Sequence, residues 1–435
     1  MTTYYVRKGG NDTTGDGSTG NPWLTIHKGI STIAAGNTLL IGDGTYAENS
    51  GLGYLTVNRA MASVTTVRSE SGNADNVIVQ GTSGSYNTYV QNTGGKWTFE
   101  DLTFTMRDGP TTANAVYITQ GQNYIFNRCK FIALGHTTIR AGLTITENSG
   151  QTVQNITFND CNFSATGSNS AYGANVASSG LGTCDTITFN NCTVTGLNTY
   201  PFRANGGTNV NVNGGNFYSP TAGIPAFVYG IDGTSNSAAV TGTISGATIK
   251  SDLSHACLIG AGASNVVVQN CNITGGDLGL VAKENSGVQF LNNVILNGTT
   301  GSIQFKAATG ATATGNRVTN NVGGFCVGLT DGDTGHKSGT VTCTNNTLMG
   351  AGASKLFFWL GDAADLGGGV CDYNQYQPNG SAKFGAVRAD ADVQNITELR
   401  AAWAGYGDGS NDSHSSLVGG DDTAVLMMMG FFGHR

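Results

Sequence analysis

The sequence repeats a ten-residue pattern three times: YIFNRCKFIA (residues 124–133), ITFNDCNFSA (156–165) and ITFNNCTVTG (187–196). Each copy has alternating apolar positions, then Asn, one polar residue, Cys and a second short alternating run. Alternation with a period of two predicts strands rather than helix. The Asn between the runs predicts a corner, because Asn tolerates the left-handed backbone conformation. Cys129, Cys161 and Cys192 recur at a nearly constant spacing, which predicts a solenoid of stacked coils.

Weaker copies of the pattern continue downstream. Aligned on the Cys129 position, they place in register Gly215, Ala247, Cys271, Asn293, Asn316 and Asn346. Their spacings fall into a short class and a long class. The short class, at roughly 22 residues, suits a coil of three short strands and three turns, and insertions of about ten residues are expected as loops on the turns.

Both ends of such a stack need a cover, because an uncovered coil exposes its core and its strand edges. Apolar residues at helical spacing before Gly36 predict a short helix over residues 25–35, and a second helix is predicted over 396–404. The apolar run at 424–432 is too short to span a bilayer. We expect it to pack on the last coil or against another subunit.

The repeats and the N-terminal segment resemble the right-handed parallel β-helix of the pectate-lyase-like superfamily, which includes secreted enzymes and phage tailspikes or depolymerases. The resemblance covers nearly the whole chain. It implies an all-β fold, a single-stranded right-handed parallel β-helix with a short N-terminal capping helix. On this basis, residues 1–56 are the expected N-terminal cap, 57–376 the β-helix, and 377–435 a C-terminal cap with an apolar tail.

Composition and charge limit the partners. The chain has 435 residues, of which 11% are charged, and its net charge is −7. It has no cluster of Lys and Arg, which argues against nucleic acid, and no apolar run near the ~20 residues of a membrane span. The start, Met1 followed by TTYY, lacks a secretory signal pattern. We therefore expect an extracellular protein whose signal was removed, or a virion-associated protein. A homo-oligomer is one of the alternatives for its assembly, and a trimer is the expected form if it is virion-associated.

Nine cysteines are present, and four of them, Cys129, Cys161, Cys192 and Cys271, occupy one repeat position that should point inward. We expect a stack of buried free thiols that act as small hydrophobic residues. Disulfides between neighbouring coils are the alternative. The acidic loop from Asp12 to Asp16 offers a Ca²⁺ site, but side chains that bond nearby backbone explain it better.

In this superfamily the active groove follows the sheet that precedes the repeat start. Counting back from the aligned coils places Lys283 and Lys306 at one outward position of neighbouring coils. The resemblance points to an acidic glycan, with Lys283, Lys306 and Arg203 as the candidate catalytic residues. The less solvated lysine is a candidate base for β-elimination. Two solvated surface lysines are the alternative.

Further residues are expected to bind the substrate along the same sheet or in the loops beside it. They are Asn205, Tyr229, Asp232, Glu284, and the loop cluster Lys250, Asp252 and His255. Glu147, Asp232, Asp331 and Asp362 also suit the edge of the groove. Two carboxylates about 5–9 Å apart would suit glycoside hydrolysis.

The motifs of the known enzymes are not matched. The paired Asp and Gly-His-Gly pattern of polygalacturonases is missing, and so are clear counterparts of the pectate-lyase calcium site and of the alginate-lyase Lys-Ser pattern. Fold alone does not establish a reaction. The sequence therefore leaves two hypotheses: a lyase or glycoside hydrolase acting on an extended, acidic polysaccharide, and a non-catalytic virion or surface protein that binds glycan.

Overall fold

The structure is a computed structural model. It describes residues 1–51, 53–82, 86–91, 94–105, 114–133, 141–165, 172–178, 180–196, 200–230, 239–320, 322, 324–330, 338–351, 356–360, 370–379, 383–387, 391–393, 397–398, 401 and 414–417. The chain divides into two compact units, residues 1–271 and 272–435, and each unit is described separately. The domain boundaries expected near residues 56 and 376 stay predictions.

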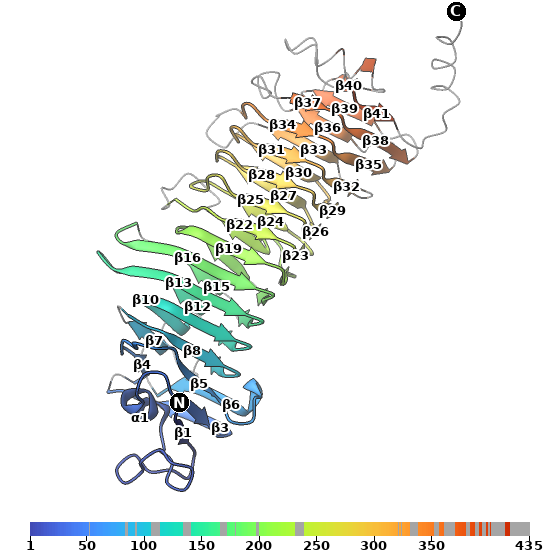
Figure 1. Ribbon diagram of the computed structural model, residues 1–435. Coiled ribbons are helices and arrows are strands. Elements are labelled where there is room, and N and C mark those ends of the chain that lie inside the picture. The colour runs from blue at the N-terminus through green and yellow to red at the C-terminus, as the bar shows by residue number, and fades with distance from the viewer. Residues whose placement is uncertain are drawn as a thin grey trace, which may run out of the picture. The chain divides into compact units, whose positions relative to one another are not determined.

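The first unit is a stack of coils in which the chain passes through three parallel sheets in turn (Figure 1). Sheet 1 contains β1 (Thr3–Val6), β2 (Thr38–Ile41), β5 (Thr65–Ser69), β8 (Trp97–Glu100), the C-terminal half of β10 (Asn114–Asn127), β13 (Thr152–Asn159), β16 (Thr183–Asn190), β19 (Thr208–Asn213), β22 (Thr243–Ser245) and β25 (Val267–Gln269). Sheet 2 contains β3 (Gly44–Glu48), β6 (Val77–Gly81), β9 (Thr103–Thr105), β11 (Lys130–Ala133), β14 (Asn162–Ala165), β17 (Thr193–Gly196), β20 (Asn216–Ser219) and β23 (Thr248–Ser251). Sheet 3 contains β4 (Leu55–Val57), β7 (Tyr86–Gln91), the N-terminal half of β10, β12 (Ala141–Ile145), β15 (Tyr172–Val176), β18 (Phe202–Ala204), β21 (Phe227–Tyr229) and β24 (Cys257–Ile259).

The second unit has the same order of parallel strands. Its sheet 1 contains β28 (Gln289–Leu291), β31 (Thr312–Thr314), β34 (Thr342–Thr344) and β37 (Val370–Asp372). Its sheet 2 contains β26 (Asn272–Thr274), β29 (Val294–Leu296), β32 (Arg317–Asn320), β35 (Thr347–Ala351), β38 (Gln375–Asn379) and β41 (Ser416–Leu417). Its sheet 3 contains β27 (Leu278–Lys283), β30 (Gly301–Lys306), β33 (Phe325–Thr330), β36 (Leu356–Leu360) and β39 (Lys383–Val387), and β40 (Ala391–Val393) pairs antiparallel with β39.

The alternating repeats build the core of the first unit. Phe99, Phe126, Phe158 and Phe189 form one column of stacked rings on sheet 1, with centroids 5.1, 5.1 and 4.9 Å apart. A second column on sheet 2 contains Phe104, Phe131 and Phe163. Burying each ring stabilises the fold by roughly 2 kcal/mol, and parallel register brings identical residues into contact. The prediction of an all-β parallel solenoid is therefore confirmed.

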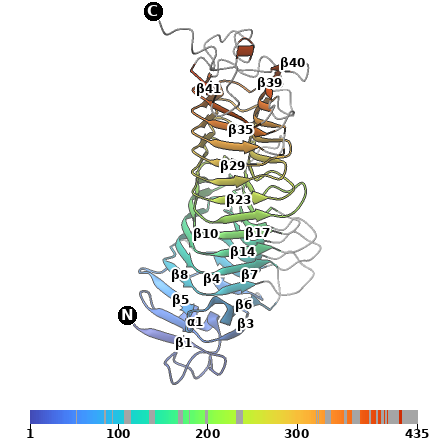
Figure 2. The ribbon, with the colours of Figure 1, turned by 90° about the vertical axis from the view of Figure 1, so that its right-hand side faces the viewer.

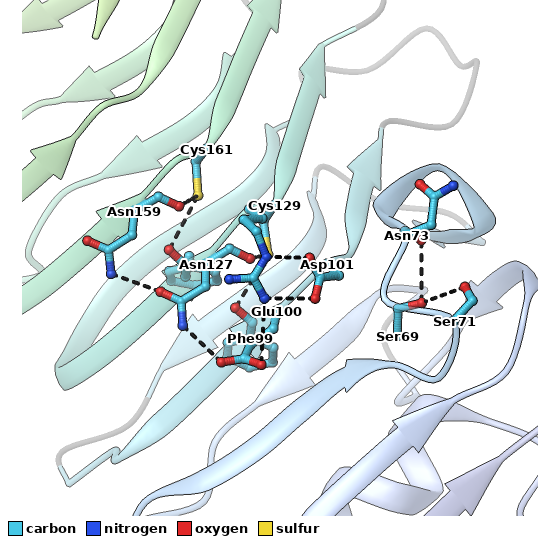
Figure 3. A network of polar contacts seen from close by, with 12 residues as sticks. Ser69, Ser71, Asn73, Phe99, Glu100, Asp101, Asn127, Cys129, Asn159 and Cys161 are labelled. Carbon is cyan, nitrogen blue, oxygen red and sulfur yellow. Dashed lines mark hydrogen bonds and ion pairs between the residues drawn. The ribbon is translucent and has the colours of Figure 1, made fainter. Parts of the chain in front are cut away.

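The asparagines of the three repeats form a stack, part of which Figure 3 shows. The side-chain amide of Asn159 donates to Asn127 Oδ1 at 2.8 Å, and that of Asn190 donates to Asn159 at 2.8 Å. Asn213 continues the ladder at one end. At the other end, Asn127 Nδ2 donates to Glu100 Oε1 at 2.9 Å. We call these five residues the outer ladder, because their side chains lie at the surface of the corner.

The left-handed corner lies one residue later than expected. Asn127, Asn159 and Asn190 end their strands, and the positive φ angles belong to the next residues, Arg128, Asp160 and Asn191, at 52°, 53° and 51°. The physical reason is the ladder itself. An extended Asn keeps its amide in register with the next coil, so the turn must be made by the following residue. Arg128 also forms an ion pair with Asp101, at 2.8 Å.

The cysteines follow the prediction. All nine are free and buried. Cys129, Cys161 and Cys192 occupy the inward corner position, and each thiol donates to a carbonyl of the preceding coil, at 3.5, 3.3 and 3.6 Å. Burial raises the pKa of the Cys161 thiol well above its usual value. These thiols therefore act as small core residues.

The N-terminal end is covered by α1 (Ile26–Thr32), as expected, although the helix is shorter than the predicted 25–35. Thr25 caps it by accepting a hydrogen bond from the Lys28 amide. The buried carboxylate of Glu48 accepts from the amides of Ile26 and His27, both at 2.8 Å. One short 3₁₀ turn, η1 (Ala74–Asn76), precedes β6. Figure 2 shows α1 beside the first strands of this unit.

Most of the second predicted helix, over 396–404, and the apolar tail at 424–432 lie outside the described residues. Within the described part of the chain, no helix is long and apolar enough to cross a membrane.

Candidate functional site

A continuous row of outward-facing residues crosses sheet 3 of the first unit. Strand register places side by side Thr56, Tyr89, Tyr117, Thr144, Asn175 and Arg203. We call these six residues the sheet 3 row. Neighbouring parallel strands lie about 4.8 Å apart, so the row presents one side chain per coil at a regular spacing. Beyond Arg203 the next outward residues, Val228 and Leu258, are buried, at 2% and 1% exposure.

One end of the row is aromatic. The rings of Tyr89 and Tyr117 stack with centroids 5.8 Å apart and an interplanar angle of 14°. Tyr54 packs edge-on against Tyr89 at 5.9 Å. Tyr89 Oη accepts a hydrogen bond from Thr119 Oγ1 at 2.9 Å. Partly exposed tyrosines combine an apolar face with a polar tip, which is the surface that a sugar ring can contact.

The other end of the row is cationic. Arg203 Nη1 donates to Tyr172 Oη at 2.9 Å, and the guanidinium carbon lies 5.7 Å from the Tyr172 ring centre. Tyr172 in turn stacks on Tyr200, with centroids 6.0 Å apart. With the Asn205 amide oriented to satisfy both of its ends, its oxygen accepts from Arg203 Nη2 at 3.3 Å and its nitrogen donates to the Val176 carbonyl at 3.0 Å. The structure therefore brings together Arg203 and Asn205, two residues singled out in the sequence.

Polar groups occupy the middle of the row. Thr144 Oγ1 donates to Asn114 Oδ1 at 2.7 Å. Asn175 Oδ1 is enclosed and accepts no hydrogen bond from a described residue. An enclosed amide oxygen without a donor costs free energy. The middle of the row is thus where an additional donor would stabilise the protein.

Glu147 follows β12 and is buried, at 3% exposure. Its Oε1 accepts from Ser178 Oγ and from the Gly180 amide, both at 2.9 Å. Burial, followed by the charge of Glu147, raises the pKa of Cys184 to about 12. Of the four carboxylates considered for hydrolysis, only Glu147 is described, since Asp232, Asp331 and Asp362 lie outside the described residues.

In the second unit, Lys283 and Lys306 are register partners at the ends of β27 and β30. This placement agrees with the sequence-based alignment of their coils. Lys283 is only 8% exposed, whereas Lys306 is half-buried, so Lys283 is not the fully solvated lysine of the alternative interpretation. Glu284 follows directly in a left-handed conformation, at φ 50°, and its amide donates to the Lys306 carbonyl at 2.8 Å.

The loop cluster is partly assembled on sheet 2 of the first unit. Lys250 Nζ lies 2.9 Å from Asp252 Oδ1, and Tyr218 Oη donates to Asp252 Oδ2 at 2.5 Å. The Tyr218 hydrogen bond and then the Lys250 ion pair lower the pKa of Asp252. His255 is half-buried and its carbonyl accepts from the Ala226 amide.

The prediction that Tyr229 binds the substrate is wrong. Tyr229 is completely buried and its hydroxyl donates to the Val210 carbonyl at 2.6 Å, so it cannot contact a substrate. The reason is that Tyr229 occupies an inward position of β21, where its ring packs 5.2 Å from Phe227. Burial raises its pKa well above the usual value.

The acidic loop near the N-terminus has a structural explanation. Asp12 accepts hydrogen bonds from the amides of Leu24 and Thr25 and from the Thr25 hydroxyl. Asp16 accepts from the Ser18 amide at 2.9 Å, which lowers the pKa of Asp16. Within the described residues, no group of three or more His, Cys, Asp or Glu side chains is arranged to hold a metal ion.

Sequence reasoning identified Arg203 but missed Tyr89 and Tyr172. Tyr89 lies in a coil that precedes the clear repeats, so no alignment reached it. Its separation from Tyr117 is within the range of one coil, and this is the signal that could have found it. Tyr172 likewise precedes Arg203 by the length of one coil.

Comparison with known proteins agrees with this architecture. A family model for a right-handed β-helix region matches residues 168–348. No curated protein matches the chain.

Solved structures with a similar fold include three proteins of low sequence identity. A lacto-N-biosidase from Eubacterium ramulus is 8% identical with a TM-score of 0.42, and the alignment covers 96% of this chain and 68% of that protein. The Dettilon tailspike protein is 14% identical with a TM-score of 0.47, covering 88% and 68%. The A-module of a mannuronan C-5 epimerase from Azotobacter vinelandii is 14% identical with a TM-score of 0.39, covering 88% and 91%. From its repeats, its parallel sheets and the matching family model, the chain is a right-handed parallel β-helix protein.

Proposed function

We propose that this chain is a polysaccharide-active β-helix protein that binds an extended glycan along the sheet 3 row of its first unit. The observation that carries the proposal is the row itself: stacked tyrosines at one end, Thr144 and Asn175 in the middle, and Arg203 at the other end, in strand register. A ligand that lies along such a row must itself be extended and must offer both apolar faces and hydrogen-bonding groups. Polysaccharides have this chemistry.

The parts of the row have different roles. Tyr89 and Tyr117 offer flat aromatic surface for sugar rings. Arg203 offers guanidinium donors to an acidic group. We propose that the protein is extracellular or virion-associated, where it meets such glycans.

The catalytic part of the proposal concerns Lys283 and Lys306 in the second unit. Desolvation and a neighbouring cation are the two features that activate a lysine as a base. In β-elimination, the base removes the proton next to the uronate carboxylate and a carbon–carbon double bond forms as the bond to the neighbouring sugar oxygen breaks. That oxygen leaves with the bonding electron pair and takes up a proton from water. Lys283 is the more buried of the pair and is the residue we assign as base, with Lys306 holding the carboxylate.

A panel of acidic and neutral polysaccharides tests the proposal. Ultraviolet absorbance detects the unsaturated products of a lyase, reducing ends detect a hydrolase, and affinity electrophoresis detects binding without cleavage. Tyr117→Ala should weaken binding about tenfold, the size expected for losing one stacking ring. Tyr373→Ala, which removes an exposed tyrosine of the second unit, is the matched control and should have no effect. Equal affinities for the unsubstituted protein, Tyr117→Ala and Tyr373→Ala would exclude the sheet 3 row as the glycan-binding site.

Lys283→Ala and Lys306→Ala test the catalytic assignment. Each substitution should abolish turnover, while the melting temperature of the protein and its affinity for the glycan change little. Binding without any turnover in the unsubstituted protein would favour the alternative, a non-catalytic virion or surface protein that binds glycan.

A further inference from the structure

A hollow of about 380 Å³ lies on the outer face of sheet 1 in the first unit, over strands β2, β5 and β8. Its lining includes two hydroxyl groups, one aliphatic side chain, one cation and one carboxylate, from Thr38, Thr66, Leu40, Arg68 and Glu100. The chain on both sides of each of these residues is among the described residues. Pockets for small molecules occupy about 300–1,000 Å³, so the hollow has room for one small ligand.

One buried hydroxyl of this hollow has no partner in the described part of the chain. Thr38 is only 7% exposed, and its Oγ1 makes no hydrogen bond with a described residue. Thr66 is half-buried beside it, in strand register, and adds a second hydroxyl. A buried hydroxyl without a partner is unfavourable. A ligand that exchanges a hydrogen bond with Thr38 would therefore stabilise the protein.

A cation and an anion line the hollow one strand step apart. Arg68 is exposed, and its guanidinium makes no hydrogen bond or ion pair with a described residue, although Glu100 is its register partner. Glu100 Oε1 accepts from Asn127 Nδ2 at 2.9 Å, and Oε2 lies 3.9 Å from Arg128, which is itself paired with Asp101. The hollow thus offers N–H donors and a carboxylate acceptor. Because these charges cancel, a neutral ligand suits it better than an anion beside Glu100.

We infer that this hollow is a second sugar-binding site, which takes one neutral sugar residue of a glycan on the outer face of sheet 1. Sugar hydroxyls both donate and accept, so one ring can accept from Arg68, donate to Glu100 and pair with the threonine hydroxyls. Leu40 is half-buried and gives an apolar surface to the C–H groups of the ring. The site lies on a different sheet from the sheet 3 row, so it goes beyond the proposed function and is tested separately.

Leu40 gives a signal that reports on this hollow alone, because its side chain lines it. In the full chain with isotope-labelled leucine methyl groups, the Leu40 resonance is identified by its loss in Leu40→Ile. The protein is titrated with three neutral tetrasaccharides, maltotetraose, cellotetraose and mannotetraose. Tetragalacturonate and glycine serve as an anionic and a zwitterionic comparison. We expect a neutral tetrasaccharide to shift the Leu40 signal until it saturates, with an affinity that does not depend on salt.

Two variants test the contacts. Thr38→Val keeps the shape of the side chain and removes the hydroxyl, so it should weaken neutral sugar binding about threefold while the melting temperature stays the same or rises. A purely structural threonine would lower the melting temperature and leave the affinity unchanged. Arg68→Met should weaken binding about tenfold. Thr157→Val is the matched control, because Thr157 belongs to the same outward row outside the hollow, and it should change neither quantity.

A Leu40 signal that moves only with tetragalacturonate or only with glycine would overturn the inference, and so would a signal that moves with none of the ligands. Unchanged affinities in both Thr38→Val and Arg68→Met would overturn it as well. Tyr117→Ala separates this site from the proposed function, because it should weaken binding to the sheet 3 row and leave the Leu40 titration unchanged. If Tyr117→Ala abolishes the Leu40 shift, the hollow is not a site of its own.

Discussion

The inward corner position is filled differently in the two units. In three successive coils of the first unit it holds Cys129, Cys161 and Cys192, whose thiols each donate to a carbonyl of the preceding coil. In the second unit it holds the buried residues Asn293, Asn316, Asn346 and Asn374. The same backbone corner therefore accepts either a small, nearly apolar side chain or a strongly polar one.

The asparagines succeed only because they are fully connected. The backbone N–H and the side-chain Nδ2 of Asn316 both donate to Asn346 Oδ1, at 2.9 and 3.0 Å. The same Nδ2 also donates to the Phe290 carbonyl at 2.8 Å. Asn346 makes the equivalent bonds to Asn374 and to the Ala313 carbonyl. A buried amide network is stable when complete and costly when interrupted. Each thiol of the cysteine corner makes a weak hydrogen bond to the preceding coil, whereas the asparagine corner is one array of strong, interdependent hydrogen bonds.

The largest expected effect comes from interrupting that array. Asn346→Leu leaves the backbone amide and one side-chain N–H of Asn316 without their acceptor. It also removes the side-chain donor to Asn374 Oδ1 and to the Ala313 carbonyl, while the backbone N–H at position 346 still donates to Asn374 Oδ1. Each stranded buried group costs about 1–3 kcal/mol, so we expect a loss of about 3 kcal/mol or more. Thermal and denaturant unfolding measure it. A loss below about 1 kcal/mol, the lower bound for a single stranded group, would show that the array is not interdependent.

A smaller effect is expected in the cysteine corner. Cys161→Ala removes one small buried group and a weak hydrogen bond to the Phe126 carbonyl. We expect a loss of about 1 kcal/mol, similar to deleting a methyl group from a core. The double substitution with Cys192→Ala should cost about 2 kcal/mol, still less than Asn346→Leu, and a larger loss than that of Asn346→Leu would contradict the weaker role of this corner.

The smallest effect concerns pH at the end of the asparagine array. Burial would raise the pKa of Asp372, but hydrogen bonds from His414 and from the Tyr373 amide outweigh it and lower the pKa. A carboxylate whose pKa is lower in the folded than in the unfolded protein stabilises the fold at pH values above the unfolded pKa. This stabilisation is lost as the pH falls through the folded pKa. The protection factor of the Asn374 amide against hydrogen exchange, corrected for the intrinsic pH dependence of exchange, should therefore fall in acid. Asp372→Asn should flatten this dependence, and an unchanged pH profile would exclude Asp372 as its cause.

Sequence reasoning was most accurate where packing alone decides the structure. Val116, Ile118, Phe202 and Ala204 alternate with more exposed residues along their strands and are buried, because period-two alternation leaves one face for the core. It failed where a polar group finds a partner that no pattern encodes. Tyr229 reaches the Val210 carbonyl inside the core instead of facing a substrate.

The candidate site was only partly predictable for a related reason. Register on sheet 3 could be counted in coils with clear repeats, which gave Arg203, Lys283 and Lys306. The tyrosine end of the row lies in coils whose corner motif has diverged, so Tyr89 could be placed only by strand pairing. Loop lengths between coils vary from one turn to the next, and alternation does not report them.

The outer ladder has a defined first member, and this bears on how nearly identical coils avoid pairing with the wrong neighbour. Every amide in it donates toward the preceding coil, and the series ends at the carboxylate of Glu100. The strand before Glu100 carries Arg68 at the same register. If β10 skipped one coil, Asn127 would meet a guanidinium, which can only donate. A single acidic residue thus favours one pairing partner, β8, for the C-terminal half of β10. Glu100→Gln, whose side chain also accepts a hydrogen bond, should keep this pairing, whereas Glu100→Lys should lose it.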